Sequence, residues 1–433
     1  MPGPLDGIRV LELTQIIAGP MCGVMLSDLG ADVVKIESPQ GDGTRVIGQF
    51  APNESKGFHV FNRGKRGIVL NLQSEDGRAV VYRLIRDFDV FLINARPGVA
   101  ERLGIDYETL STHNRRLIYL ENTAFGPEGP SAERAGADII AQAYSGLMVG
   151  DGKMDDQGNP TLITATTPAD FGAAFNGATA VCAALFHRER TGRGQLIETS
   201  LLGAALTLQN YIASRQPVSD SMLIQPSRDA MQEVRERGGS YRELLEARSG
   251  LRAITGAAYL LYYGGYQTAD GAIMLGCVTP PNRQQVRSAL GLTEADDATD
   301  APGFNPLSPD SAAIVRHAQR SIAERFRSNT TAHWMARLDA AGAPASQVNT
   351  PEDILDDPQV QAIGAPLELE HPLTGPETMI GPMIRMSDSP LEAQGPSPEF
   401  DGDTDQVLRE HGYRDEEIAA LRASGAIGIE EER

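Results

Sequence analysis

The sequence predicts an α/β fold with a mainly parallel sheet, and three observations point to it. Short apolar segments alternate with amphipathic ones along the N-terminal third, which is the order of βαβ units. The connecting segments are long enough for the right-handed crossovers that parallel strands need. The chain has 433 residues, of which 41% are hydrophobic and 22% charged, so it can bury a large core. We therefore expect a Rossmann-like large domain and a smaller α+β domain.

Strands of the large domain are expected where apolar and β-branched residues form short runs. These runs are residues 8–13, 31–37, 67–72, 90–94, 117–122 and 195–198. Helical patterns lie between and after them, at residues 21–29, 76–87, 107–113, 138–149, 171–187 and 199–214. The first strand is followed by LTQIIAGPMCGVM, which contains no G-x-G-x-x-G, so dinucleotide binding in the usual mode is disfavoured.

The composition changes in the middle of the chain. Residues 219–249 are charged and irregular, and predict a linker with a polar helix at 231–248. The smaller domain is expected at 251–329, with strands at 258–263 and 272–278 and helices at 282–290 and 311–327. The large domain then comprises residues 1–213 and 330–433, with 214–250 as a linker or insert. Its last part is expected to hold a helix after Thr331, a strand at 367–371 and a helix pair within 403–424.

Charge and cysteine content limit which partners, which cellular location and which kinds of site we expect for this protein. A net charge of −20 disfavours nucleic acid as a partner, because binding phosphates needs a basic surface. The sequence opens without the pattern of a signal peptide, and apolar runs stay shorter than a membrane span, so we expect neither secretion nor a membrane anchor. Cys22, Cys182 and Cys277 are an odd number in apolar or small-residue surroundings, which indicates free thiols in a reducing cytoplasm. Cys and His residues lack the spacing of a metal site, so no metal is expected.

One acidic residue lies where a helix is expected to start. Asp170 follows a proline and precedes a long run of small residues. By itself it is a good N-cap, for which Asp is among the preferred residues. The alternative is a nucleophile, held ionised by the amides and dipole of the helix start, with small neighbours leaving room for an electrophile. The residues leave both interpretations open. At the other end of this helix, Arg188 and Arg190 suit the negative pole and Gly192 a left-handed stop.

Six segments then carry a family resemblance. In order, they read LDGIRVLELTQIIAGPMCGVMLSDLGADVVKIESPQGDGTR, FNRGKRGIVLNL, FLINARPGVAERLGID, TGRGQLIETSLLGAAL, ASQVNTPEDILDDPQVQ and LREHGYRDEEIAAL. Together they resemble the class III CoA-transferases, the family of formyl-CoA transferase and carnitine CoA-transferase. The resemblance covers the whole chain except about residues 219–249. It implies that Asp170 attacks an acyl-CoA thioester, that CoA passes through an aspartyl thioester to an acceptor carboxylate, and that CoA is a substrate while no cofactor is tightly bound.

The resemblance also implies a CoA site at the carboxyl ends of the N-terminal strands. The residues that match family contacts are Ile16, Ile17, Ala18, Leu72, Asn94, Ala95 and Arg102. Arg102 is the candidate for a phosphate, because its guanidinium suits one, and a solvated surface position is the alternative. Several relatives carry an arginine where this chain has Ser38, so Lys35 or Arg45 are candidates to replace it.

Two further parts of the site follow from the same match. Asp138 takes the place of an acid beside the nucleophile, or alternatively caps the helix that follows it. Gly264 and Gly265 take the place of a glycine-rich loop over the site, with a plain β-turn as the alternative. The family also implies an interlocked homodimer, in which residues 214–249 and 329–341 would be the crossing segments.

Two rival functions remain. Within the family, an α-methylacyl-CoA racemase needs two bases on opposite faces of the α-carbon, and the histidine that supplies one of them in relatives matches Ala137 here, so racemisation is disfavoured. A non-catalytic acyl-CoA-binding protein would need no carboxylate at Asp170. The acyl pocket is expected within residues 219–278, and small carboxylic or dicarboxylic acids are the expected acceptors.

Overall fold

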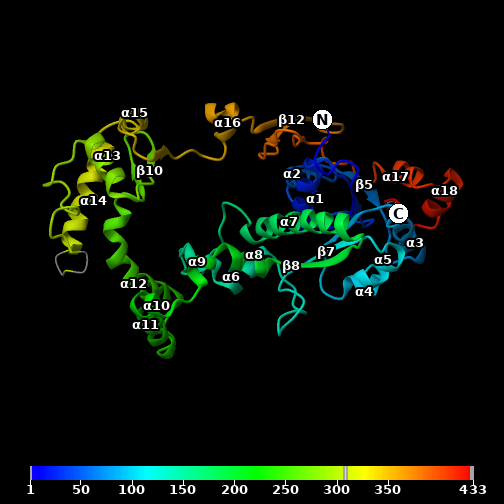
Figure 1. Ribbon diagram of the computed structural model, residues 1–433, viewed down its shortest axis with the longest axis horizontal. Helices are drawn as coiled ribbons and strands as arrows, with labels where there is room; N and C mark the ends of the chain where they lie inside the picture. Colours follow the sequence, from blue (N-terminus) through cyan, green and yellow to red (C-terminus); the bar gives the residue numbers. More distant parts are fainter. Residues whose placement is uncertain (1, 306–307, 309–310, 430–433) are drawn as a thin grey trace. The chain divides into compact units, whose positions relative to one another are not determined.

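The computed structural model describes residues 2–305, 308 and 311–429 (Figure 1). The chain forms two compact units. The first comprises Met1–Lys153, Thr161–Ser214 and Pro358–Arg433, and the second comprises Met154–Pro160 and Arg215–Asp357. Residues 330–357 were expected in the large domain but belong to the second unit. The reason is that β11 (Ala345–Gln347) pairs with β10 (Ala272–Leu275), and α15 (Thr331–Ala341) packs on both strands.

A six-stranded parallel sheet is the frame of the first unit. Its strands are β1 (Arg9–Leu13), β2 (Asp32–Glu37), β5 (Arg66–Val69), β6 (Val90–Ile93), β7 (Ile118–Thr123) and β8 (Gln195–Ser200). They lie in the order β5-β2-β1-β6-β7-β8, and every neighbouring pair is parallel. Numbered along the chain, this is the 3-2-1-4-5-6 order of a doubly wound fold. The predicted parallel sheet is confirmed, with the third strand ending at Val69 rather than residue 72.

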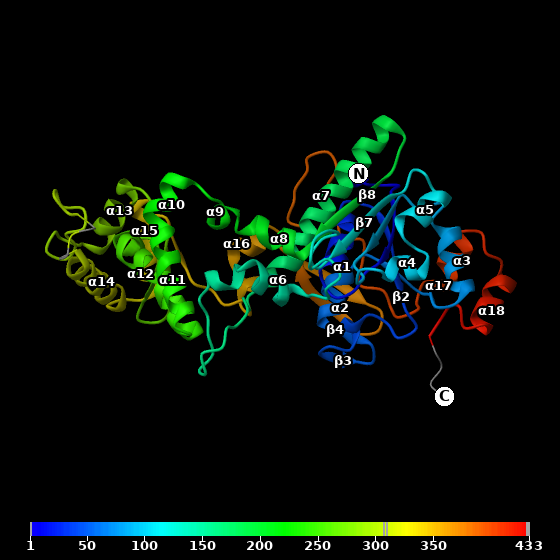
Figure 2. The same cartoon turned by 90° about the horizontal axis from the view of Figure 1, so that it is seen from below.

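Helices cover both faces of this sheet (Figures 1 and 2). One face carries α1 (Ala18–Asp28) and α7 (Pro168–Thr191), and the other carries α3 (Glu75–Leu84), α4 (Val99–Leu103), α5 (Tyr107–His113), α17 (Thr404–Glu410) and α18 (Asp415–Ala423). Strand side chains alternate between the two cores, as the pleat requires. Val10 belongs to the core under α1 and α7, whereas the next residue, Leu11, belongs to the core under α3.

The long helix α7 is the centre of one of these cores. Its length and composition would suit a membrane span, but half of its apolar stretch is buried against α1 and the sheet, as in a core helix. Small residues permit the close contact, because a Cβ on Gly177 would lie 2.9 Å from Leu120 Cδ2. The helix ends as predicted. Gly192 is left-handed with φ 73°, and Arg188 forms an ion pair of 2.9 Å with Asp89.

Shorter elements complete the first unit. They are η1 (Gly43–Arg45), β3 (Gln49–Ala51), β4 (Glu54–Ser55), α2 (Lys56–Asn62), α6 (Asp138–Ser145), η2 (Leu147–Gly150), α8 (Leu201–Leu208), α9 (Asn210–Ala213), α16 (Pro358–Ala362), β12 (Pro366–His371) and β13 (Gly375–Ile380). The strand expected at 367–371 is one arm of a hairpin, since β12 pairs antiparallel with β13. The C-terminal segment joins the edge strand β5, where Asp403 Oδ2 accepts the Gly67 N–H at 2.8 Å and Leu70 bridges Ile427.

The second unit is mainly helical around a small antiparallel sheet. Its remaining elements are α10 (Pro217–Leu223), α11 (Gln225–Glu236), α12 (Tyr241–Leu260), β9 (Gly265–Gln267), α13 (Pro280–Leu290), α14 (Ser311–Arg327) and η3 (Ile354–Asp356). The segment 219–249 was expected to be irregular apart from a polar helix at 231–248. It is instead mostly helical, and the expected helix is divided between α11 and α12, where Ser240 starts α12 with a capping box. The strand expected at 258–263 is also wrong. Its apolar run continues α12 to Leu260, and a short apolar run does not distinguish helix from strand.

Candidate active site

The carboxyl ends of the parallel strands open onto a cavity of about 560 Å³. The chain segments that leave β1, β2, β5 and β6 line one part of it, and the starts of α6 and α7 line another. The order of strands reverses between β1 and β6, which is the point where doubly wound sheets bind ligands. The position of the cavity therefore agrees with the site expected from the sequence.

Asp170 lies in this cavity as the third residue of α7. Thr167 is the N-cap of the helix and Pro168 is its first residue, a position that suits the missing N–H of proline. The interpretation of Asp170 as an N-cap is therefore wrong. Its side chain is only 7% exposed and faces the cavity. A buried carboxylate at a cavity wall is free for chemistry when a different residue caps its helix.

The side chain that caps α7 is that of Asp138, because the N-cap residue Thr167 makes no side-chain cap hydrogen bond. Its Oδ1 accepts the backbone N–H groups of Ala169 at 2.7 Å and of Asp170 at 3.3 Å, while its Oδ2 accepts a hydrogen bond from Gln142 Nε2. Asp138 is the first residue of α6, whose own N-cap is Ala137. The alternative that Asp138 caps the helix following it is thus wrong. It caps α7, far along the chain, and thereby fixes the helix that carries Asp170.

This arrangement sets the protonation of Asp170. Burial, and next the nearby charge of Asp138, raise the pKa of Asp170 to about 7. The expectation that helix amides hold Asp170 ionised is wrong, because Asp138 occupies the amides at the start of α7. A carboxylate with a raised pKa is more basic, and so a better nucleophile once it is ionised.

Small side chains surround Asp170. The starts of four helices meet in one buried cluster, whose members are Ala18, Ala141, Ala169, Ala173, Leu201, Ala204 and Ala205. A Cβ on Gly172 would lie 3.1 Å from Ala204 Cβ, so α7 and α8 approach closely at this point. The small residues that were noted in the sequence therefore pack helices together beside the cavity.

Most of the predicted CoA contacts line the same cavity as Asp170 and Asp138. They are Ile16, Ile17, Ala18, Leu72, Asn94 and Ala95. Arg102 is exposed on α4, and within the described part of the chain it lies outside the lining of this cavity. Gly264 and Gly265 belong to the second unit, at the turn into β9, so their role as a loop over the site stays a prediction.

The positive charges at the cavity differ from those expected. Ser38 lines the cavity, but Lys35 and Arg45 do not replace an arginine there because both are fully buried in ion pairs. Lys35 Nζ lies 3.0 Å from Asp42 Oδ2, and Arg45 forms two hydrogen bonds, of 2.7 and 2.8 Å, with Glu37. Two exposed arginines line the cavity instead, Arg96 after β6 and Arg134 before α6. Sequence reasoning missed both, although Arg96 lies within the motif FLINARPGVAERLGID, directly after a strand.

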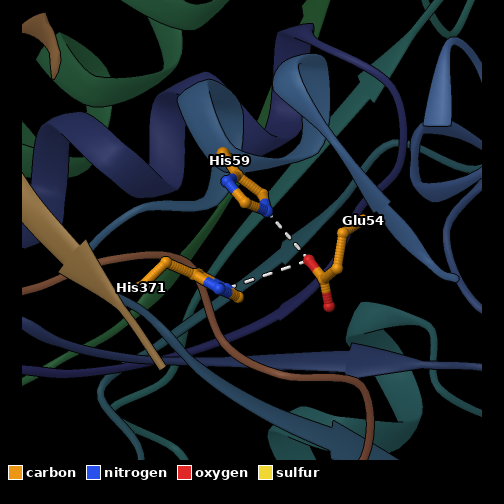
Figure 3. Close-up of side chains that lie close together, drawn as sticks. All are labelled: Glu54, His59 and His371. Atoms are coloured by element: carbon orange, nitrogen blue, oxygen red, sulfur yellow. Dashed lines mark hydrogen bonds and ion pairs between the residues drawn. The ribbon is translucent and has the colours of Figure 1, made fainter. Parts of the chain in front are cut away.

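A second cluster of ionisable groups lies elsewhere in the first unit. Figure 3 shows Glu54, His59 and His371 close together, with Glu54 Oε2 2.8 Å from His59 Nε2 and 3.8 Å from His371 Nε2. The two rings stack with their centroids 4.3 Å apart. His371 Nδ1 accepts the backbone N–H groups of Leu373 and Thr374 at 3.3 Å each, which places the proton of this ring on Nε2. A metal ion would need His371 Nε2 unprotonated. The cluster therefore suits a protonated nitrogen facing the Glu54 carboxylate better than it suits a metal ion.

Comparison with known proteins identifies the family. Residues 5–404 match the family model described as CoA-transferase family III. The chain belongs to this family. The resemblance found in six sequence segments is thereby confirmed.

Several relatives align with this chain over nearly the full length of both proteins. The chain is 28% identical to human succinyl-CoA:glutarate CoA-transferase, over 98% of this chain and 90% of that protein. It is 32% identical to succinate–glutarate CoA-transferase of Agrobacterium fabrum, over 94% and 95%. It is 31% identical to formyl-CoA:oxalate CoA-transferase of Streptomyces coelicolor, over 98% and 99%. Among solved structures, a CAIB/BAIF family protein from Brucella suis aligns with a TM-score of 0.71 and 30% identity, over 95% and 100% of the two chains.

Proposed function

We propose that this family III CoA-transferase moves CoA from an acyl-CoA thioester to a carboxylic acid, with Asp170 as the nucleophile. One observation carries the proposal. The Asp170 carboxylate is buried, has a raised pKa and faces the cavity at the strand ends, while Asp138 caps its helix. A carboxylate attacks an acyl carbon only when it is ionised, and burial then protects the anhydride that forms from water.

The reaction divides into four exchanges at acyl carbons. A carboxylate oxygen of Asp170 bonds to the donor acyl carbon, and the C–S bond breaks to give a mixed anhydride and the CoA thiolate. The thiolate attacks the carbonyl carbon of Asp170, which releases the donor acid and leaves an aspartyl-CoA thioester. The acceptor carboxylate displaces the thiolate to form a second anhydride. The thiolate then attacks the acceptor acyl carbon, and Asp170 leaves as a carboxylate.

This sequence needs no net proton, water or ATP, because each step exchanges one activated acyl bond for another. The protein must instead keep water from the two anhydrides. We expect Gly264 and Gly265 to contribute by covering the site, as the family resemblance implies.

The lining of the cavity supports the binding of CoA. Ile16, Ile17 and Leu72 offer apolar surface, and the exposed guanidinium groups of Arg96 and Arg134 can pair with phosphates. We assign the phosphate contact to these two arginines rather than to Arg102. The acceptor is proposed to be a small carboxylic or dicarboxylic acid. The names of the relatives, which include glutarate and oxalate CoA-transferases, support this class.

An interlocked homodimer is proposed for the assembly. Large apolar side chains on α8 and α9 support it, because Leu208 is 55% and Tyr211 95% exposed. A second copy would cover them in an obligate interface of more than roughly 2,000 Å². Sedimentation at low protein concentration tests the assembly, and a stable, active monomer would contradict it.

A trapping experiment tests the nucleophile. The enzyme is incubated with donor acyl-CoA but no acceptor, and then with hydroxylamine or borohydride. An acyl group on Asp170 is activated, so hydroxylamine should give the hydroxamate and borohydride the alcohol. Peptide mapping should find the change on the peptide containing TTPADFGAAF, and only after exposure to acyl-CoA. An unmodified Asp170 in enzyme that is turning over would mean direct transfer and would overturn the proposal.

A further inference from the structure

The turn between β1 and α1 contains a residue in a strained conformation. Ile16 has φ 70°, a left-handed value that is rare and costly for a β-branched side chain. Ile16 lines the active-site cavity, and the helix that follows begins at Ala18, which packs in the small-residue cluster with Ala169 and Ala173. Strain of this kind persists only where surrounding groups hold the backbone in place.

The side chain of Asn94 holds the backbone next to Ile16 in place. Its Oδ1 accepts the Gln15 N–H at 2.8 Å, and its Nδ2 donates to the Gln15 carbonyl oxygen, also at 2.8 Å. The backbone pairing of β1 with β6 ends at Leu13 and Ile93, so the carboxamide continues it by one more pair of bonds. Both polar groups of the Asn94 side chain are thus hydrogen-bonded to the backbone of Gln15, the residue before Ile16.

Close packing keeps this carboxamide in place. A Cβ on Gly19 would lie 3.1 Å from Asn94 Cγ and 2.5 Å from Thr14 Cβ, so the start of α1 closes over the turn. Two buried side chains add support. Lys35 Nζ donates to the Thr14 carbonyl oxygen at 2.7 Å, and Asp42 Oδ1 lies 3.4 Å from the Ile16 nitrogen.

We propose that Asn94 is a positioning residue, which holds Ile16 left-handed and so shapes the cavity wall for the CoA thioester. The resemblance implied a direct contact between Asn94 and CoA, whereas the side chain is engaged with Gln15. The proposal rests on the proposed function, because it concerns the same cavity. Without the carboxamide, Ile16 relaxes toward negative φ, and the surface offered by Ile16 and Ile17 is displaced.

Binding of free CoA, measured by titration calorimetry, tests the proposal without any transfer reaction. Asn94→Ala should weaken CoA binding by roughly tenfold or more, because the binding-competent wall is then only a minor state. Asn94→Asp should weaken it similarly, because an oxygen then replaces the donor that faces the Gln15 carbonyl. The KM for donor should rise while kcat at saturation stays within about threefold, since uniform binding is what is lost.

The coupling between two substitutions distinguishes positioning from a direct contact. Glycine adopts positive φ without cost, so in an Ile16→Gly background Asn94→Ala should weaken CoA binding less than about twofold, whatever affinity Ile16→Gly itself loses with its apolar side chain. Ile17→Gly is the matched control background, in which Asn94→Ala should still weaken binding roughly tenfold, because Ile17 has φ −129°. Wild-type affinity in Asn94→Ala overturns the proposal, and so does an effect of Asn94→Ala that is as large in a folded Ile16→Gly background as in wild type. If Asn94→Ala does not fold, Asn94→Asp and its double variant with Ile16→Gly give the same readout. A wild-type protein that binds CoA but transfers none would refute the proposed function alone.

Discussion

Asp138 and Asp170 are coupled through one hydrogen bond and one repulsion. The Asp138 carboxylate lies 3.3 Å from the backbone nitrogen of Asp170, and its negative charge contributes to raising the pKa of the Asp170 side chain. The residue that fixes the start of α7 therefore also raises the basicity of Asp170. Substitutions at Asp138 can separate its role as a cap from the effect of its charge on the pKa of Asp170.

Asp170→Ala should abolish CoA transfer, with a loss of about a thousandfold or more, because it removes the proposed nucleophile. Binding of CoA and the fold should persist, since the side chain does not cap its helix. Turnover by mass spectrometry and titration with CoA measure the two properties. Asp155→Ala, which removes an exposed acid of the second unit, is the control and should keep its activity.

Asp138→Asn should move the acid limb of the kcat/KM profile to lower pH, because the charge that helps to raise the pKa of Asp170 is gone. The asparagine oxygen can still accept the Ala169 N–H, but its amide then faces Gln142 Nε2, so the melting temperature should fall modestly. Asp138→Ala removes the cap as well, at a cost of about 1 kcal/mol. An unchanged profile in Asp138→Asn would show that burial alone sets the pKa.

Asp170→Asn should stabilise the ligand-free protein at neutral and alkaline pH. The folded state holds the pKa of Asp170 at about 7, above the 3.8 of a solvent-exposed aspartate, so wild-type stability declines as pH rises between these values. The variant lacks this decline. Its melting temperature should match that of wild type near pH 4, exceed it increasingly up to pH 7, and stay above it by a constant amount beyond. A constant difference at all pH values would contradict the raised pKa.

His59→Gln should destabilise the protein more at pH 6 than at pH 9. Burial lowers the pKa of His59, but hydrogen bonds to Glu54 and Glu377 outweigh it, and the net shift is upward. Such a histidine stabilises the fold fully below its unfolded pKa, and the contribution is lost as pH rises through the folded value. Thermal unfolding across this range measures it, with exposed His187→Gln as the control. An equal effect at both pH values would mean that His59 is neutral in the fold.

No deuterium should enter the α-carbon when a 2-methylacyl-CoA is incubated with the enzyme in deuterated water. Racemisation needs a base on each face of that carbon, and Ala137 lines the cavity where the resemblance would place one of them. Incorporation at a rate near that of CoA transfer would reveal a second base.

Local sequence predicted elements well where one pattern dominated. The helices at 107–113 and 311–327 have the predicted bounds, because apolar spacing and polar flanks agree in both. The apolar run at 258–263 is compatible with both helix and strand. In the structure its first residues form the end of α12, which the run alone could not predict.

The candidate site was predictable as a set of segments but not as a set of contacts. The family resemblance implied Ile16 and Asn94 as contacts, and both line the cavity because the loops after β1 and β6 meet at one edge of a parallel sheet. That Asp138 caps α7 depends on how two distant helices pack, and no local pattern encodes it. Arg96 and Arg102 lie in the same motif, and only the backbone path decides which one lines the cavity.

The contacts of β5 with the C-terminal segment have a consequence for the nascent chain. The Gly67 N–H, the Val69 N–H and Leu70 find their partners in Asp403, Thr404 and Ile427. Every strand of the parallel sheet, and then the whole second unit, is therefore synthesised before the C-terminal segment is available to cover the edge strand β5. An open strand edge is a template for pairing with other chains, so this interval is when the protein most needs a chaperone. Deletions that remove residues 403–429 should leave the cavity-lining sequence intact and still yield aggregates during synthesis.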